Sequence, residues 1–303
     1  MKIGLIAADG HNFPNLALMK IAAYHKQQGD TVEWVNYFEK YDKVYISKVF
    51  TFTPDVTTVI QADEIERGGT GYSIRKRLHP DIDALQPDYS IYQNLDGKTA
   101  YGFLTRGCIR NCKWCVVPAK EGAIKAYMDI EVVLQGRENA ILMDNNILAC
   151  AYGLYQLERI AKIGCKVDFN QGLDARLVTG DVAKMLSKIK WIRSIRFSCD
   201  SKQSIPALLN AVEALDFYGV KPNRIFCYVL LNDDIADSLS RIETCRKAGI
   251  DPFAQPYRDF TTNQVVPQWQ KDMSYWCNQK QALKSCDFRD YQPRRGFYCR
   301  EYF

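Results

Sequence analysis

Apolar strand-like runs alternate with helix-like stretches over much of the chain beyond residue 100, and this alternation restricts the fold to few architectures. Repeated βα units place their strands parallel and their connections right-handed. Six such units favour an α/β fold with a partial (β/α)6 TIM-type barrel over the complete barrel of eight units. The expected strands are Tyr101–Arg106, Ala140–Asp144, Val167–Asn170, Ser194–Ser198, Arg224–Leu231 and Pro252–Tyr257, and the expected helices are Leu154–Ile163, Gly180–Lys190, Ile205–Tyr218 and Asp234–Ala248.

A smaller α/β pattern precedes this series. Strands are expected at Lys2–Ala8, Val32–Val35 and Lys43–Ser47, with a helix at Leu16–Gln28. Residues 75–98 are polar, contain two prolines and are expected to form a connector. We therefore expect a small Rossmann-like domain at residues 1–95, the partial barrel at 96–262, and a basic, aromatic C-terminal extension at 263–303.

The cysteine content and the lack of targeting patterns bear on the compartment. The 303 residues include 11 cysteines, an odd number, and no apolar run is long enough to span a bilayer. The N-terminal run resembles a core strand rather than a signal peptide. We expect a cytoplasmic protein without membrane contact, whose thiols are reduced or bind metal. The net charge of +5 is too small to indicate a nucleic-acid partner by itself.

Three cysteines lie close together after the first strand of the longer series, at Cys108, Cys112 and Cys115. This Cys-x3-Cys-x2-Cys spacing can bring three thiolates to one centre. Iron–sulfur clusters normally take four cysteine ligands, so three would leave one iron open to another ligand. A zinc site completed by a distant Cys or His, and unrelated core thiols, are the alternatives. The neighbouring cations expected to favour the thiolate forms are Arg106, Arg110 and Lys113.

The stretch from Gly107 to Cys115, GCIRNCKWC, resembles the signature of the radical S-adenosylmethionine superfamily, with Trp114 at its aromatic position. The resemblance covers residues 101 to about 260. It implies a 4Fe–4S cluster held by the three cysteines, with S-adenosylmethionine on the fourth iron. It also implies an external electron donor of flavodoxin or ferredoxin type, and cleavage of the cofactor to methionine and a 5′-deoxyadenosyl radical that abstracts hydrogen from a substrate. Trp114 would shield the cluster or pack on adenine.

Polar residues at strand ends are the candidate cofactor contacts, because sites in such barrels lie at the C-terminal face. Many relatives bind the methionine amino group with Gly-Gly-Glu after the second strand. Here Asp144 and Asn146 offer acceptors instead, unless they form a turn and a helix N-cap. Asn170 and Arg176 follow the third strand and suit ribose or carboxylate contacts, with Arg176 preferred for the methionine carboxylate. The alternative there is a loop closed by an Asp–Arg pair. Further pocket candidates are Asp200, Asn232, Gln255, Tyr257 and Arg258. No catalytic residue is identified.

The N-terminal domain resembles the cobalamin-binding domains that precede some radical S-adenosylmethionine cores, through its Phe13–Tyr24 segment and its Gly68-Gly69 pair. His11 stands where such domains ligate cobalt. Pro14 occupies the place of the motif's glycine, and residues 54–68 leave little room for a crossover helix, so we expect no bound cobalamin. His11 is then a strand-end histidine satisfied by the backbone. A lid that contacts substrate through Asp9, His11 and Asn12 is a further hypothesis.

The tail interleaves arginines with aromatic residues, a pattern that can hold single-stranded nucleic acid. Packing of these aromatics on the barrel is the favoured explanation, and a second cluster on Cys277, Cys286 and Cys299 is an alternative. For the substrate, a small molecule or a nucleic-acid-derived group is expected. Modification of a nucleobase, nucleoside or RNA is favoured over peptide or small-metabolite chemistry. A zinc-stabilised nucleic-acid-binding module is the alternative of another class.

Overall fold

The structure is a computed structural model that describes residues 1–259, 262 and 265–303, and its architecture is mixed α/β with parallel sheets. In the N-terminal part, a four-stranded parallel sheet has the order β2-β1-β3-β4. Its strands are β1 (Lys2–Ala7), β2 (Thr31–Trp34), β3 (Lys40–Ser47) and β4 (Gln61–Gly68), accompanied by helix α1 (Leu16–Gln27) and the short α2 (Pro80–Asp83).

Each face of this sheet has its own apolar core. Ile3 and Leu5 of β1 pack with Leu18 and Met19 of α1 on one face. Successive side chains of a strand alternate between faces, so Ile6 belongs to the other core.

The chain between β2 and β3 covers that second face. A methyl group on Gly4 would lie 2.6 Å from a Val35 methyl carbon. Residue 4 therefore has to be small where the chain between β2 and β3 crosses the sheet. Tyr41 and Val44 complete this core.

The larger part contains two further parallel sheets. One has the order β10-β9-β8-β5 and the other β11-β12-β13. A parallel bridge between Leu173 and Phe197 links the residues after β9 to β11, and the Leu173 amide donates to the Arg196 carbonyl at 2.7 Å. Within the described residues these strands do not pair into a closed ring. The bounds are β5 (Thr99–Gly102), β8 (Asn139–Leu142), β9 (Lys166–Phe169), β10 (Lys190–Trp191), β11 (Ile195–Ser198), β12 (Ile225–Leu231) and β13 (Asp251–Pro256).

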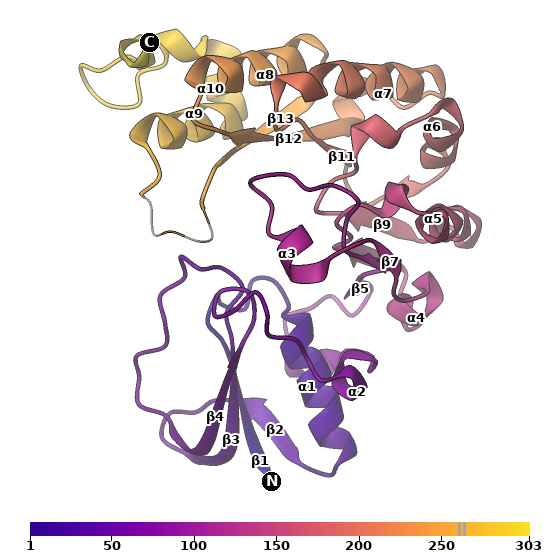
Figure 1. Ribbon diagram of the computed structural model, residues 1–303, viewed down its shortest axis with the longest axis vertical. Coiled ribbons are helices and arrows are strands. Elements are labelled where there is room, and N and C mark those ends of the chain that lie inside the picture. Colours follow the sequence, from indigo (N-terminus) through magenta and orange to yellow (C-terminus); the bar gives the residue numbers. More distant parts are fainter. Residues whose placement is uncertain (260–261, 263–264) are drawn as a thin grey trace.

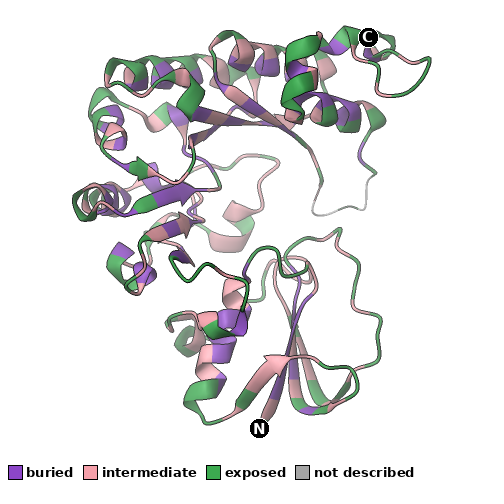
Figure 2. Ribbon diagram, turned by 180° about the vertical axis from the view of Figure 1, so that it is seen from behind, coloured by how far each residue is buried: buried purple, intermediate pink, exposed green. Residues whose placement is uncertain are grey.

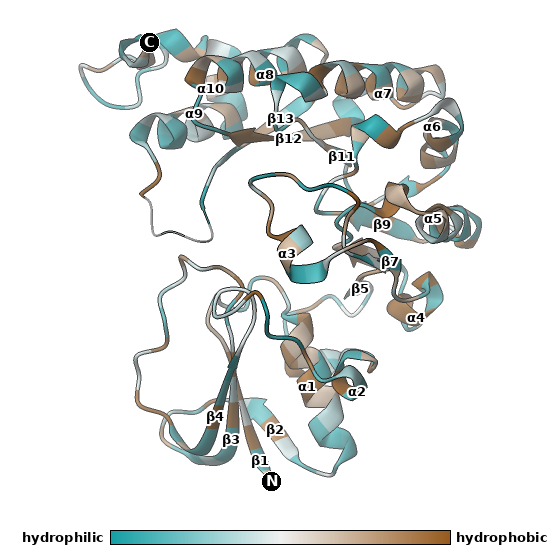
Figure 3. Ribbon diagram, in the orientation of Figure 1, coloured by the Kyte–Doolittle hydropathy of each residue, from teal (hydrophilic) through white to brown (hydrophobic). Residues whose placement is uncertain are grey.

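Helices line the outer side of these strands (Figure 1). Burial is concentrated in the strands and in the helix faces that touch them (Figure 2). The outer helices accordingly alternate between hydrophilic and hydrophobic residues (Figure 3), as expected for one apolar stripe on each helix. These helices are α4 (Ile130–Leu134), α5 (Ala151–Ile163), α6 (Gly180–Ser187), α7 (Ile205–Phe217) and α8 (Ile235–Lys247).

The C-terminal segment packs onto the larger part. Helix α9 (Gln268–Asn278) lies against β13, where the Asn278 side chain bonds to both the amide and the carbonyl of Ala254. Trp276 is fully buried. A short helix α10 (Lys280–Ser285) follows. Tyr291 and Tyr302 also pack against this core, so the explanation that the tail packs its aromatics is confirmed for these two residues. Among the described residues after β13 the regular elements are helices.

Most elements expected from the sequence are confirmed with ends shifted by a few residues, whereas β4 was not expected. No helix lies between β3 and β4, which agrees with the expectation that residues 54–68 leave little room for a crossover helix. No helix in the described part of the chain combines the length and apolar character that crossing a bilayer requires.

Candidate functional site

The three clustered cysteines lie on a loop that leaves the sheet through β6 (Thr105–Arg106) and returns through α3 (Val117–Glu121) to β7 (Lys125–Ala126). β6 and β7 pair antiparallel and close the base of the loop. The loop and α3 lie on the inner side of the strands, opposite the outer helices (Figure 1).

Gly107 makes the sharp exit from β6. Its φ is +84°, and a Cβ there would lie 2.3 Å from the Ala123 carbonyl oxygen. Only glycine tolerates both the left-handed backbone and the close approach. The Cys108 amide then donates to the Gly122 carbonyl at 3.1 Å, so the cysteine loop starts and ends at the same place.

Glu121 ties this base together. Its carboxylate accepts two hydrogen bonds from Arg106, at 3.0 and 2.6 Å, and one from the Gly107 amide at 2.9 Å. Asn145, after β8, donates to the same carboxylate at 2.9 Å. Glu121 was not predicted, because an acid six residues after the last motif cysteine carries no signal in the sequence.

Asp144 supports the loop from below. It is 1% exposed, and its carboxylate accepts from the amides of Leu104 and Thr105 and from the Thr105 hydroxyl at 2.7 Å. Burial raises the pKa of Asp144 to about 6, although these hydrogen bonds favour the charged form. Asp144 thus has partners within the chain, at Leu104 and Thr105, and its contact with the cofactor ammonium stays a prediction.

The three motif thiols are each partly exposed, whereas most other cysteines of the chain are buried. The Arg110 amide and the Asn146 side chain both point a hydrogen at the Cys108 sulfur, at 3.3 and 3.5 Å. Burial raises the pKa of Cys112, Arg176 opposes this shift, and Cys108 adds to it. Burial also raises the pKa of Cys115, and the other two thiols add to this shift.

The cations that the sequence assigned to the thiolates have other partners. Arg106 binds Glu121, and the Arg110 Nε lies 3.0 Å from the Asp174 carboxylate. Lys113 lies 5.9 Å from the Trp114 ring centre. The pKa values of Cys112 and Cys115 are raised, so burial outweighs any effect of neighbouring cations at these two thiols.

Asp174 joins the loop to the segment after β9. It accepts from Arg176 Nε at 2.6 Å and Nη2 at 3.0 Å, from Arg110, and from Asn146 at 3.2 Å. Burial works to raise the pKa of Asp174, but the hydrogen bonds from Arg176 and Arg110 hold it below its usual value. The alternative of a loop closed by an Asp–Arg pair is thus confirmed, and that pair lies beside the cysteine loop.

Asn146 has one unused acceptor. Its side-chain nitrogen bonds to Cys108 and Asp174, while its side-chain oxygen is buried and has no hydrogen-bond partner. An unpaired buried acceptor is costly, so it is a position where a ligand donor would be stabilised.

Trp114 lines a hollow of about 660 Å³ with residues that follow β11 and β12. Asp200 and Asn232 belong to this lining, and partial burial raises the pKa of Asp200. Asn232 also bonds to Asp237 at the start of α8. Asn170 is not part of this lining, and its carbonyl accepts from the Tyr228 hydroxyl at 2.9 Å.

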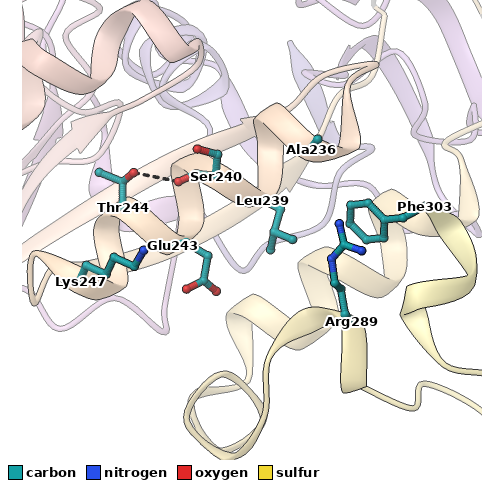
Figure 4. Close-up of a pocket in the computed structure, with 8 residues that line it drawn as sticks. All are labelled: Ala236, Leu239, Ser240, Glu243, Thr244, Lys247, Arg289 and Phe303. Atoms are coloured by element: carbon teal, nitrogen blue, oxygen red, sulfur yellow. Dashed lines mark hydrogen bonds between the residues drawn. The ribbon is translucent and has the colours of Figure 1, made fainter.

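A second hollow, of about 340 Å³, lies between α8 and the C-terminal segment (Figure 4). Its lining includes Glu243, Lys247, Arg289 and Phe303, none of which was predicted to bind a cofactor. No residue of the cysteine loop lines this second hollow, which shares Ala236 and Ser240 with the first.

The remaining candidates lie at the contact between the two parts of the chain or within the N-terminal domain. Gln255 and Arg258 are exposed, and Arg258 packs on Phe52. Asp9 accepts from the Val49 amide at 2.6 Å. The predicted backbone partner of His11 is not observed among its described contacts; its ring instead packs on Trp34, with centroids 4.2 Å apart. The other two, Asn12 and Tyr257, are exposed and partly buried respectively.

Within the described residues, no three His, Cys, Asp or Glu side chains are grouped so that they could hold a metal ion as they stand. The donor chemistry nevertheless suits an iron–sulfur cluster, because three partly exposed thiols share one short loop. In comparisons with known proteins, no family model matches the chain and no curated protein matches it.

Proposed function

We propose that this chain is a radical S-adenosylmethionine enzyme in which Cys108, Cys112 and Cys115 hold a 4Fe–4S cluster. The observation that carries the proposal is the set of three partly exposed thiols on one loop, whose base is closed by the pairing of β6 with β7. When bound, such a cluster supplies the electron that cleaves S-adenosylmethionine to methionine and a 5′-deoxyadenosyl radical.

The fold that we propose around this loop is a partial (β/α)6 barrel. The pairing β5-β8-β9 and β11-β12-β13, together with the Leu173–Phe197 bridge, supports an open arc of six parallel strands. The N-terminal sheet is proposed to be a small Rossmann-like domain, because α1 joins two of its parallel strands.

Three residues are proposed to bind the cofactor's methionine end and ribose. The unpaired oxygen of Asn146 accepts from the amino group. Arg176 uses two of its five N–H donors on Asp174 and offers the others to the carboxylate. Asn170 contacts the ribose. Trp114 packs on the adenine or shields the cluster.

Asp144 has a positioning role in this proposal. By holding the amides of Leu104 and Thr105, it fixes the point from which the cysteine loop departs. A cytoplasmic location and an electron donor of the flavodoxin or ferredoxin type are parts of the same proposal.

Anaerobic reconstitution of the full chain with iron and sulfide tests this function. Wild type should bind about four irons per chain and form 5′-deoxyadenosine from S-adenosylmethionine with dithionite. Cys112→Ala should lose both. Cys286→Ala, which removes a partly exposed cysteine outside the loop, should retain both. Zinc in place of iron, or equal losses in the two variants, would reject the proposal and favour a zinc-stabilised binding module.

A further inference from the structure

Two phenylalanines form an exposed stacked pair on the loop that follows β3. The rings of Phe50 and Phe52 lie 5.1 Å apart with an interplanar angle of 20°. Their exposed fractions are 51% and 52%, so half of each ring faces solvent. Large aromatic rings held together on a surface, rather than scattered singly, are typical of binding sites.

The loop that carries this pair is held in place. The Asp9 carboxylate accepts from the amides of Val49 and Phe50 and from the Thr53 hydroxyl. On the other side, the Gly71 amide donates to the Lys48 carbonyl at 2.9 Å. The rings are therefore presented by a braced backbone, which lowers the entropy cost of binding a ligand on them.

Positive charge surrounds the pair. The Arg258 guanidinium, from the segment after β13, lies 4.2 Å from the Phe52 ring centre. Arg75, Lys76 and Arg77 are exposed and follow Gly71 by four to six residues, so chain length limits their backbone to about 14–21 Å from that glycine. Lys76 pairs with Glu66. The run from residue 67 to residue 80 contains no acidic residue.

The same surface adjoins the cysteine loop. Lys120 of α3, the helix directly after the motif cysteines, donates a hydrogen bond to the Thr70 hydroxyl. Thr70 lies between Gly69 and Gly71, whose backbone packs on residues 48–50. A ligand lying across the phenylalanine pair is thus one short loop away from the proposed cluster site.

We infer that this surface binds single-stranded nucleic acid, with bases stacked on Phe50 and Phe52 and phosphates held by Arg258 and by the cations at 75–77. Flat rings flanked by cations recognise unpaired bases without needing a particular sequence. Base pairing in a duplex would hide the faces that the rings need. The inference rests on the proposed function, since it names the substrate class of that enzyme.

The C-terminal tail is a weaker candidate for this role, because two of its arginines are already paired with carboxylates. These two are Arg294 and Arg300. Arg289 lies over Phe303 at 3.9 Å, Arg294 over Phe297 at 3.8 Å, and Arg300 over Tyr298 at 4.4 Å.

Fluorescence anisotropy with labelled single-stranded 12-mers of mixed sequence, one RNA and one DNA, on the reconstituted full chain tests the inference. The double variant Phe50→Ala/Phe52→Ala should bind at least about tenfold more weakly than wild type. Phe38→Ala is the matched control, since Phe38 is 93% exposed in the same domain but lies on the turn before β3, at the other end of that strand from Phe50 and Phe52. It should bind as wild type does.

Charge is tested separately through the dependence on salt. Replacing Arg75, Lys76 and Arg77 by Gln should reduce the slope of log affinity against log salt by about 2, at about 0.7 per phosphate contact. A duplex of the same sequence should bind more weakly than the single strand. Tighter binding of RNA than of DNA would identify RNA as the source of the ligand, and the reverse would identify DNA.

Several results would overturn the inference: no binding of either 12-mer by wild type, equal binding by the double variant, or binding only to phosphatidylglycerol vesicles. Failure of this inference can be distinguished from failure of the proposed function. Phe50→Ala/Phe52→Ala should still form 5′-deoxyadenosine without substrate, whereas Cys112→Ala should bind the 12-mers with unchanged affinity but form none.

Discussion

At the scale of single residues, Asp144 and Asp174 show how two acids after neighbouring strands acquire different properties. Asp144 lies under the cysteine loop, where burial raises its pKa to about 6. Asp174 lies between Arg110 and Arg176, whose hydrogen bonds outweigh burial and lower its pKa. Both acids are thus explained as supports of the site, through burial in one case and charge pairing in the other.

The Asp144 shift predicts a specific pH dependence of stability. The folded state holds this proton more tightly than the unfolded state, so the free energy of unfolding falls as pH rises from about 4 to about 6. Asp144→Asn removes the titration. Over this range wild type should lose up to about 3 kcal/mol relative to the variant, in urea unfolding at pH 4, 5, 6 and 7. A difference that stays constant with pH would contradict the assignment.

Asp174→Asn should destabilise the chain because it leaves two guanidinium groups without their carboxylate. We expect a loss of about 1–2 kcal/mol in the free energy of unfolding, since hydrogen bonds between charged groups are broken but Arg176 remains partly solvated. Asp216→Asn removes an exposed pair with Lys221 and should change stability by less than about 0.5 kcal/mol. Equal effects in urea titrations would show that Asp174 does not brace the loop.

The sequence predicted several of the residues at this site but not which contacts each of them makes. The Cys108–Cys115 motif and Arg176 follow strand ends, and parallel strands bring such ends to one edge. Which of these side chains would be buried beneath the loop was not predictable. Asp144 and Asn146 are two residues apart, yet Asp144 binds the backbone beneath the loop, whereas Asn146 contacts the Cys108 sulfur. That difference depends on tertiary packing rather than on residue type.

At the scale of elements, the cysteine loop depends on the backbone of Gly107. Gly107→Ala combines a positive φ with a Cβ only 2.3 Å from a carbonyl oxygen, so it should cost more than about 2 kcal/mol. Gly97→Ala has φ +69° with nothing near its Cβ and should cost about 1 kcal/mol. Thermal unfolding of both variants measures the difference. Comparable losses would indicate that backbone strain, and not the clash, fixes the turn.

Of the elements that were not predicted, β4 and α9 escaped for different reasons. Half of the eight residues in β4 are charged, and it packs only Ala62 and Ile65 on its core, so it has no apolar strand pattern. α9 does carry a signal, because Trp269, Met273 and Trp276 recur at helical spacing. Its high content of polar and aromatic residues obscured that periodicity.

At the scale of the whole molecule, Lys20 joins the two parts. This lysine of α1 is 5% exposed and donates to the Tyr127 hydroxyl at 2.6 Å and to the Asp83 carboxylate at 3.2 Å. Burial lowers its pKa, while Asp83 opposes the shift. How the N-terminal domain packs on the larger part could not be predicted, because the contact depends on residues a hundred positions apart.

Lys20→Met should weaken this contact by about 1–2 kcal/mol, since Asp83 and Tyr127 lose a charged donor while the apolar stem is conserved. Lys26→Met, on the same helix, removes a more exposed lysine paired with Asp88 and should cost less than about 0.5 kcal/mol. Urea unfolding followed by tryptophan fluorescence compares them. If Lys20→Met proves as stable as Lys26→Met, the buried lysine does not hold the parts together.

The central claim, a three-cysteine cluster whose open iron binds S-adenosylmethionine, is tested most directly by electron–nuclear double resonance on the reduced, reconstituted chain. Cofactor labelled at the methionine amino nitrogen and at the carboxylate oxygen should show hyperfine coupling to the cluster. Arg176→Gln should weaken cofactor binding, whereas Arg159→Gln, which pairs with Glu131 on α4, should not. A cluster that forms but shows no coupling to either label would contradict the account.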